Sequence, residues 1–174
     1  MNQSSIRRSN EADFESVWDV INDGATAYRG HIPADCLHDP YMSQEELQAE
    51  IGAGVEFWGF YNSKVLSGVM GLQRVRDVLL IRHAYVRTEK QGLGIGGYLL
   101  KHLLSIADAP VLVGTWATAS WAVRFYLNQG FQLVSTDEKA RLLREYWRVP
   151  DRQIDTSVVL ADSHWFSGRL HVSA

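Results

Sequence analysis

The segment that most constrains this chain is a glycine-rich turn between an apolar strand and an apolar helix. Residues 87–97 read RTEKQGLGIGG. The backbone N–H groups at the start of the helix have no intrahelical partners, and the helix dipole adds partial positive charge there. Glycine has no Cβ atom that would keep an anion away from those amides. The turn therefore predicts a binding site for a phosphate group.

Upstream of the turn, the sequence predicts a first strand and two helices, followed by three strands. Asn10 and Asp13 mark the start of a first helix over residues 11–27, and Ser43 is expected to cap a second helix. A tight turn at Asn62-Ser63 is typical of a β-hairpin. The three strands are expected over residues 55–61, 64–73 and 78–87. Their short connections make them antiparallel neighbours.

Downstream of the turn, helices and strands alternate. A wide apolar stripe predicts a buried helix that begins at Ile95 and ends before Pro110, and Gly130 is placed to end a helix over residues 120–129. The other expected elements are strands over residues 111–115, 131–134 and 156–160 and a helix over residues 136–147. This order predicts a single α/β domain over residues 1–174, with a mixed sheet.

Charge and composition exclude several classes of protein. The net charge of −3 lacks the basic excess that nucleic-acid binding requires. The polar segment 1–8 lacks the apolar stretch of a signal peptide, and no apolar run approaches the roughly 20 residues needed to cross a bilayer. Cys36 has no second cysteine to pair with, which suits a reducing compartment. We therefore expect a cytoplasmic protein with a small-molecule partner and no membrane or nucleic-acid partner.

Two nucleotide-binding motifs match the glycine turn. Gly92, Gly94 and Gly97 have the spacing of the dinucleotide fingerprint G-x-G-x-x-G, but that fingerprint needs an acidic residue ≈ 20 positions later. Residues 115–118 read TWAT and offer no carboxylate. The preceding antiparallel strands also conflict with a parallel doubly wound sheet. The dinucleotide interpretation is therefore the weaker alternative.

The second motif resembles the pyrophosphate-binding signature of the GNAT acetyltransferase superfamily. It reads Gln91-x-x-Gly94-x-Gly96 and follows a strand whose apolar last residue lies five positions before the glutamine. A further resemblance lies at residues 122–131, AVRFYLNQGF, which is similar to the helix-to-strand motif of that superfamily. The two motifs come in the right order, and the order of elements agrees over residues 5–160.

This resemblance implies a mostly antiparallel α/β (α+β) sheet of about six to seven strands with helices on both faces. In the superfamily two central parallel strands splay apart and hold the pantetheine arm of acetyl-CoA, and these correspond to residues 81–86 and 111–115. Ala119 stands where relatives often carry an asparagine that contacts the cofactor, and Ser120 is the expected replacement. The residues implied to bind acetyl-CoA are Tyr85, Val86, Arg87, Gln91, Gly92, Leu93, Gly94, Ile95, Gly96, Gly97 and Ser120.

The resemblance also implies the chemistry, which is direct attack of a primary amine on the thioester of acetyl-CoA. Tyr126 matches the tyrosine of the superfamily that protonates the leaving thiolate. Many relatives carry a glutamate base on the strand before the glycine turn, but this chain has none there. His83 is the nearest residue with a suitable pKa range, and a water chain is the alternative. A core aromatic at Tyr126 and a structural histidine at position 83 remain open interpretations.

The acceptor is expected to be a small, partly apolar amine. By resemblance, the pocket is walled by Tyr28, His31, Tyr41, Trp116 and Trp147. No metal is expected, because the ligand types between residues 31 and 38 lack a regular spacing. Relatives are often homodimers. The predicted function is that of an acetyl-CoA-dependent N-acetyltransferase; the alternatives are a non-catalytic acyl-CoA-binding module and a protein or peptide N-terminal acetyltransferase.

Overall fold

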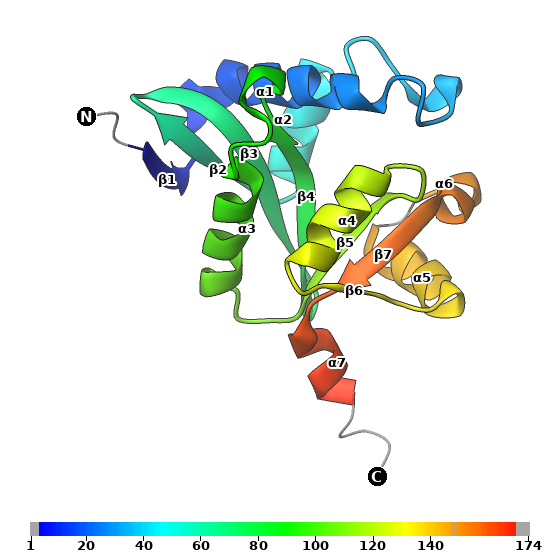
Figure 1. Cartoon of the computed structure of the whole chain (residues 1–174). Helices are drawn as coiled ribbons and strands as arrows, with labels where there is room; N and C mark the ends of the chain where they lie inside the picture. The colour runs from blue at the N-terminus through cyan, green and yellow to red at the C-terminus, as the bar shows by residue number, and fades with distance from the viewer. Residues whose placement is uncertain (1–3, 148, 170–174) are drawn as a thin grey trace. The chain divides into compact units, whose positions relative to one another are not determined.

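The computed structural model describes residues 4–147 and 149–169, and seven of its strands form one sheet in the order β1-β2-β3-β4-β5-β7-β6 (Figure 1). The strands are β1 (Ser4–Arg8), β2 (Val55–Asn62), β3 (Val65–Val75), β4 (Val78–Val86), β5 (Val111–Trp116), β6 (Gln132–Leu133) and β7 (Ser157–Ala161). The helices are α1 (Phe14–Gly24), α2 (Gln44–Gly52), α3 (Ile95–Ile106), α4 (Ser120–Asn128), α5 (Thr136–Leu142), α6 (Asp151–Thr156) and α7 (Ser163–Arg169). The predicted α/β class with a mixed sheet is confirmed.

Most neighbouring strands of this sheet are antiparallel, including β1 with β2, β2 with β3, and β7 with both β5 and β6. The neighbours β4 and β5 run parallel. Their starts are joined by a hydrogen bond in which the Leu79 N–H donates to the Pro110 carbonyl oxygen at 2.9 Å. The splay that the superfamily resemblance implies for these two strands stays a prediction.

The chain divides into two compact units. The first contains the described residues up to Arg74 together with Ile81–Ile106, and the second contains Val75–Leu80 and the described residues from Ala107 on. The predicted single domain over residues 1–174 stays a prediction.

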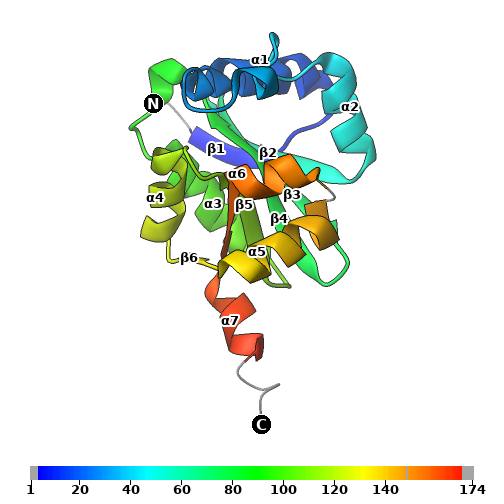
Figure 2. The ribbon, with the colours of Figure 1, turned by 90° about the vertical axis from the view of Figure 1, so that its right-hand side faces the viewer.

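In the first unit, strand β2 packs against helices on both of its faces, because alternate side chains of a strand point to opposite faces. Val55 and Phe57 belong to a buried cluster with residues of α1 and α2. The Trp58 ring packs at a tilt against that of His102 on α3, with ring centroids 4.8 Å apart. The buried members of the cluster are Val17, Val20, Ile21, Met42, Leu47, Val55, Phe57, Tyr61, Leu66 and Val69. Figures 1 and 2 show α1 and α2 together, on the side of the strands away from α3.

Side-chain caps fix where the first two helical segments begin. The Asn10 side-chain oxygen accepts a hydrogen bond from the Ala12 N–H, and the Asp13 carboxylate accepts one from the Asn10 N–H, each at 2.9 Å. Ser43 and Glu46 form the same reciprocal box at the start of α2. Each box satisfies amides that a helix start leaves without partners. The predicted starts of both helical segments are confirmed.

Several predicted boundaries were wrong by one residue or more. The β2–β3 turn lies at Ser63-Lys64, one residue later than predicted, because Asn62 still pairs with Val65. Ser63 and Lys64 have φ values of 47° and 76°, which suits the right-handed twist of a hairpin. The predicted helix over residues 136–147 ends as α5 at Leu142 and continues as a π-helical turn. Helices α6 and α7 were not predicted.

The second unit has its own core around β5 and β7. Tyr146 is buried in it, and its hydroxyl donates a 2.8 Å hydrogen bond to the Asp77 carboxylate. The buried side chains of this core are Val78, Leu80, Leu112, Leu142, Leu143, Tyr146, Ile154, Val159, Ala161 and Trp165. Figure 2 shows α5 lying across these strands. This unit carries the second sequence motif on α4 and the turn that follows it.

An ion pair near the start of the chain links β1 to the first helical turn and makes the stability of the fold depend on pH. Arg7 donates two hydrogen bonds to the Asp13 carboxylate, at 2.7 and 2.9 Å, and its guanidinium lies 3.9 Å from the centroid of the Tyr61 ring. The hydrogen bonds from Arg7 lower the pKa of Asp13 to about 2. A carboxyl whose folded-state pKa is depressed stabilises the fold above its unfolded-state pKa and loses this contribution as pH falls.

We therefore expect the Asp13 contribution to be complete above about pH 4 and lost as the pH falls to about 2. Asp13→Asn should lower the free energy of unfolding at pH 7 and make it less dependent on pH in that range. Urea unfolding at pH values from 2 to 7 measures both effects. Asp19→Asn, an exposed residue on α1, is the matched control and should keep the dependence of the wild-type protein. Equal pH dependence in all three proteins would contradict the prediction.

Candidate functional site

The predicted phosphate turn lies in the first unit and follows β4 directly. A short 3-10 turn over Thr88–Lys90 leads into it, and the first hydrogen bond of α3 is donated by the Tyr98 N–H to the Gly94 carbonyl oxygen at 3.0 Å. The amides of residues 95–97 precede that bond and so have no acceptor one turn back. Within residues 4–147 and 149–169, no protein acceptor is recorded for the amides of residues 92–97. An anion is the ligand that such a row of donors favours.

Backbone conformation, rather than space, explains the glycines at positions 92 and 94. Their φ values are +78° and +79°, in the left-handed region that glycine adopts readily. A Cβ atom at Gly92 would meet nothing within 4 Å, and one at Gly94 would come within 3.6 Å of the Tyr98 ring, an ordinary contact. The space beside Gly92 is therefore open to a ligand.

Neighbouring side chains hold the turn in place. The Gln91 side-chain amide donates to the Val86 carbonyl oxygen at 3.3 Å. The Asp23 carboxylate at the end of α1 accepts a hydrogen bond from the Thr88 N–H at 2.6 Å. Arg87 Nε donates to the Leu66 carbonyl oxygen at 2.9 Å. The turn thus keeps its shape through contacts with β3, β4 and α1.

A glycine substitution tests whether this turn binds the cofactor. Alanine at position 94 costs roughly 1–2 kcal/mol in the left-handed conformation, so the turn should rearrange and the Kd for coenzyme A should rise about tenfold or more. Titration calorimetry with coenzyme A measures this change. Gly54→Ala is the matched control, because Gly54 has φ +95° and no atom within 4 Å of an added Cβ but lies between α2 and β2. Equal affinities of the two variants would contradict the assignment.

Strand β4 has an irregular residue at His83, whose φ is +50°. A positive φ is uncommon for a residue other than glycine. In a regular strand the side chains of Arg82 and His83 would point to opposite faces. Here both reach the same oxygen of Glu50 on α2, Arg82 through Nη2 at 2.9 Å and His83 through Nε2 at 3.0 Å. The backbone at His83 therefore turns two consecutive side chains toward α2.

Glu50 is the carboxylate that sequence analysis missed. The superfamily resemblance points to a carboxylate on the strand before the glycine turn, whereas Glu50 lies on α2, more than 30 residues earlier. The hydrophilic helix α2 gave no signal that one of its acidic residues would face β4. Burial raises the pKa of Glu50, but the hydrogen bond from His83 and the charge of Arg82 outweigh it, so the pKa lies below its ordinary value. Glu50 is therefore ionised at neutral pH.

Three tyrosines predicted to lie at the site form one cluster. The ring centroids of Tyr28 and Tyr41 are 5.7 Å apart, and those of Tyr28 and Tyr41 lie 6.2 and 6.1 Å from that of Tyr85 on β4. Burial and the neighbouring hydroxyls raise the pKa of Tyr85 well above its ordinary value. His31, predicted to line the same pocket, is exposed. The structure thus brings two of the predicted acceptor residues against the strand that ends at the glycine turn.

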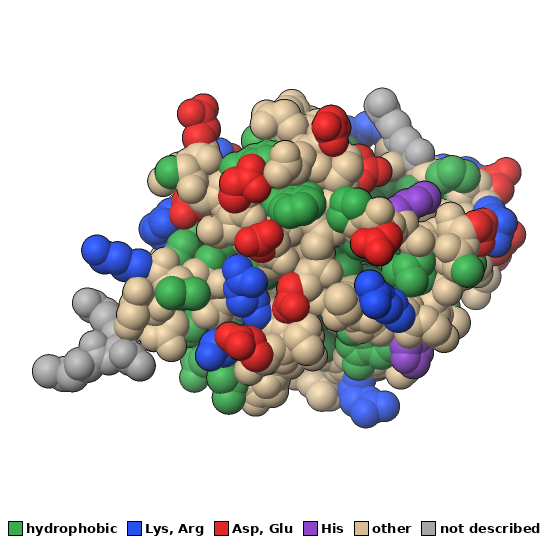
Figure 3. All heavy atoms as spheres, turned by 90° about the horizontal axis from the view of Figure 1, so that it is seen from above, with side chains coloured by type: hydrophobic (Ala, Val, Ile, Leu, Met, Phe, Trp, Pro, Cys, Tyr) green, Lys and Arg blue, Asp and Glu red, His purple; other side chains and the backbone are tan. Residues whose placement is uncertain are grey.

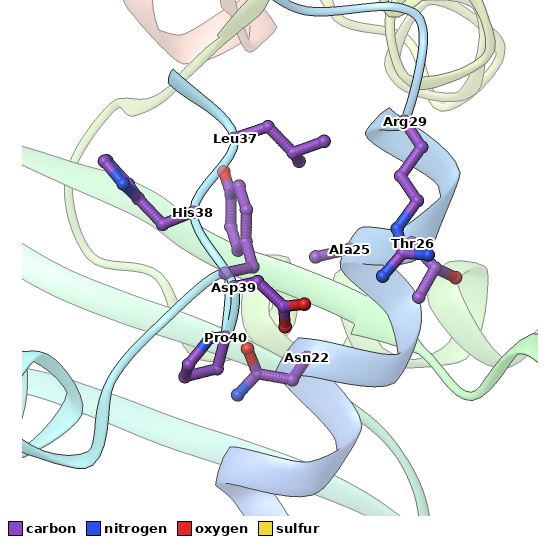
Figure 4. Close-up of a pocket in the computed structure, with 9 residues that line it drawn as sticks. Asn22, Ala25, Thr26, Arg29, Leu37, His38, Asp39 and Pro40 are labelled. Carbon is purple, nitrogen blue, oxygen red and sulfur yellow. The ribbon is translucent and has the colours of Figure 1, made fainter. Parts of the chain in front are cut away.

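A polar pocket lies beside this cluster (Figure 4). Its lining residues are Asn22, Ala25, Thr26, Arg29, Leu37, His38, Asp39, Pro40 and Tyr41. Figure 4 shows the side chains of Arg29 and Asp39 on different walls. Tyr41 belongs both to the pocket lining and to the tyrosine cluster. The pocket therefore offers hydrogen-bonding groups of both charges next to an aromatic surface.

Asn22 fixes the end of the loop that forms this pocket. Its side-chain oxygen accepts a hydrogen bond from the Met42 N–H at 2.9 Å, and its Nδ2 donates to the carbonyl oxygens of Met42 and Trp18 at 3.1 and 3.0 Å. The Trp18 indole N–H also donates to the Met42 oxygen, at 2.8 Å. Helix α1 therefore holds both ends of the loop, because the loop leaves from the turn that follows α1 and returns at Met42.

The remaining predicted site residues lie in the second unit. Tyr126 on α4 has 4% of its surface exposed and packs edge-on against the rings of Phe125 and Phe131, with centroids 5.0 and 5.6 Å away. Ser120 is exposed in the first turn of the same helix. This burial suits the alternative interpretation of Tyr126 as a core aromatic, and its role as an acid stays a prediction.

The two predicted tryptophans are placed by strand β5. Trp116 ends that strand and pairs with Ser157 of β7. The Trp147 ring packs against Gly114, where an added Cβ would lie 3.3 Å from it. Gly114 thus makes room for a large aromatic ring. Trp116 and Trp147 are both partly exposed, and their contact with an acceptor stays a prediction.

Comparison with known proteins identifies the family. Residues 22–143 match the model of the acetyltransferase (GNAT) domain, and the chain belongs to this family. A search of curated proteins finds no significant match.

Solved structures share the fold at low sequence identity. A PaiA N-acetyltransferase from Thermoplasma acidophilum, solved in complex with coenzyme A, superposes with a TM-score of 0.71 at 17% identity, covering 92% of this chain and 98% of that one. The ribosomal-protein-S18-alanine N-acetyltransferase of Escherichia coli gives 0.66 at 15% identity, covering 92% and 93%. N-acetylglutamate synthase from Neisseria gonorrhoeae, with coenzyme A and N-acetylglutamate, gives 0.62 at 22%, covering 93% of this chain and 35% of its own.

Two further features bear on the kind of site. In the part of the chain that the structure describes, no helix has the length and apolar character to cross a membrane. Among the same residues, no three His, Cys, Asp or Glu side chains gather closely enough to hold a metal ion.

Proposed function

We propose that this chain transfers an acetyl group from acetyl-CoA to the primary amine of a small molecule. The observation that carries the proposal is the row of amides at residues 92–97, for which the described part of the chain supplies no acceptor, in a chain that belongs to the GNAT family. These amides would bind the pyrophosphate of acetyl-CoA. A row of neutral N–H donors at a helix start is well suited to a dianionic group.

The proposed reaction is direct attack of the amine nitrogen on the thioester carbonyl carbon. The new C–N bond forms, the C–S bond breaks, and the thiolate of coenzyme A takes a proton. We assign that proton to the Tyr126 hydroxyl and the removal of the proton from the amine to His83. A backbone N–H would stabilise the oxyanion that forms on the carbonyl oxygen.

The acceptor is proposed to enter beside the cluster of Tyr28, Tyr41 and Tyr85. This aromatic surface favours a small, partly apolar amine over a long polyanion, and the adjoining pocket adds the opposite charges of Arg29 and Asp39. On the face seen in Figure 3, acidic and basic side chains are interspersed, which also favours a small acceptor. By resemblance to the family, and because its single cysteine suits a reducing compartment, we place the protein in the cytoplasm as a homodimer.

A screen with acetyl-CoA and pooled amines tests the proposal. Amino acids, polyamines, aminoglycosides and peptides with free N-termini form separate pools, and release of free coenzyme A thiol reports the reaction. We expect turnover with a small-molecule pool. Turnover with the peptides alone would move the function to protein or peptide N-terminal acetylation. Coenzyme A binding without turnover in any pool would identify a non-catalytic module.

The acid role of Tyr126 has its own test. Tyr126→Phe removes the hydroxyl but keeps the buried ring, so the fold and the affinity for acetyl-CoA should be retained. We expect kcat to fall about 100-fold, the lower end of what a positioned acid contributes. Calorimetry with acetyl-CoA and thermal unfolding serve as controls for binding and folding. An unchanged kcat in a folded variant would reject the role and leave Tyr126 as a core aromatic.

A further inference from the structure

The proposed base, His83, contacts a carboxylate that the proposed reaction leaves without a role. Its Nε2 lies 3.0 Å from Oε2 of Glu50. We infer that Glu50 is a positioning residue that keeps the proton of neutral His83 on Nε2, so that Nδ1 is the atom that accepts the proton of the substrate amine. This inference rests on the proposed function.

The hydrogen-bonding capacity of the two groups decides the tautomer. A neutral imidazole has one N–H donor and one nitrogen lone pair, and an ionised carboxylate can only accept. Glu50 is ionised at neutral pH, because burial raises its pKa by less than His83 and Arg82 lower it. A lone pair on Nε2 facing a carboxylate oxygen at 3.0 Å would be repulsive, so Nε2 carries the proton. The lone pair of the imidazole then lies on Nδ1.

The Glu50 carboxylate also accepts a hydrogen bond from Arg82. Arg82 Nη2 donates to the same oxygen at 2.9 Å, and Arg82 Nη1 donates to the Gln73 side-chain oxygen at 2.7 Å. The Gln73 amide in turn donates to the Ala53 carbonyl oxygen at 3.0 Å, just beyond the end of α2. This chain of hydrogen bonds fixes the carboxylate relative to β3 and β4.

The His83 imidazole is mostly buried but still in contact with solvent. Its ring centroid lies 6.0 Å from that of Phe57, which belongs to the buried cluster of the first unit. The His83 side chain is 17% exposed, so a proton can still pass to water. A positive φ on a non-glycine residue costs energy, and here it places the imidazole against Glu50. Strain of this kind is found where function requires a set geometry.

In the proton transfer, Nδ1 takes a proton from the ammonium group of the substrate. The amine nitrogen keeps the electron pair of the broken N–H bond and uses it to attack the thioester. His83 becomes an imidazolium with a proton on each nitrogen. The negative charge of Glu50 stabilises this cation, and the positive charge of Arg82 destabilises it.

These opposite charges give two substitutions with opposite expected effects. Among the described residues, the charged groups recorded around the imidazole are Glu50 of α2 and Arg82 of β4, while Phe57 of β2 contributes no charge. Glu50→Gln removes the stabilising charge, so the acidic limb of the kcat/KM profile should move to lower pH. Arg82→Gln removes the opposing charge, so the same limb should move to higher pH.

The experiment measures pH–rate profiles of the full chain with acetyl-CoA and the best amine found in the screen. Glu50→Gln should also lower kcat on the order of tenfold at pH 7 with a smaller change in KM, because the base loses its fixed tautomer. Glu45→Gln, the same change at an exposed position of the same helix, is the matched control and should behave as wild type. Limbs that move in the same direction in the Glu50 and Arg82 variants, or do not move, would overturn the inference.

Nuclear magnetic resonance of protein with ¹⁵N-labelled histidine gives a readout that needs no turnover. We expect the proton of His83 on Nε2 in the wild-type protein and a mixture of tautomers in Glu50→Gln; His83→Gln identifies the signals by removing them. A proton on Nδ1 in the wild-type protein would overturn the inference even if the enzyme is active. The Nε2 tautomer in a protein that acetylates no amine would instead count against the proposed function. If Glu50→Gln does not fold, the tautomer of the wild-type protein and the pH–rate profile of Arg82→Gln still decide whether the inference holds.

Discussion

Strand β4 lies in two different environments along its nine residues, buried in its first part and partly exposed in its second. The arrangement of the side chains around it depends on this difference. Its first residues, such as Val78 and Leu80, are fully buried in the core of the second unit. From Arg82 on, its side chains are partly exposed and belong to the first unit. A strand buried on both faces is apolar throughout, whereas the second half of β4 carries Arg82, His83 and Tyr85. The polar residues of β4 therefore all lie in its second half, in the first unit.

The irregular residue His83 lies close to this change. A regular strand would have sent Arg82 and His83 to opposite faces, with only one of them near α2. The left-handed backbone at His83 brings a cation, an imidazole and a carboxylate together instead. The network pairs its partly buried polar groups, since Glu50 accepts from two donors and Arg82 also donates to Gln73. Such a network costs little stability when every member has a partner.

Local signals made much of the fold predictable from sequence. The capping boxes at Asn10 and Ser43, the apolar stripe of α3 and Gly130 after α4 each marked an element that the structure contains, because these signals act within a few residues. The glycine turn was predictable for the same reason. The hairpin turn was placed one residue early because Asn62 favours turns, while pairing with Val65 across the strands decided the register.

The candidate site was less predictable because its contacts join residues far apart in the chain. Glu50 meets His83 across 33 positions, and nothing in the sequence of α2 distinguishes it from Glu45 and Glu46. Tyr28, Tyr41 and Tyr85 were each named as site residues, but their mutual packing required the strand and loop to be placed. Tyr126 was identified by a motif, and a motif does not reveal that the hydroxyl-bearing ring is almost entirely buried.

The hydrogen bonds between Asn22 and the Met42 backbone also indicate which part of this fold can vary. Asn22 and Trp18 hydrogen-bond to the backbone of Met42, so helix α1 closes the loop that runs from its own end to Met42. These bonds do not depend on the side chains inside the loop. The entropy of closing a flexible loop grows slowly, by roughly 0.6 kcal/mol for each doubling of its length. Insertions inside this loop therefore cost the fold little. Changes of loop length can therefore remodel one wall of the polar pocket while the helices and the glycine turn stay as they are.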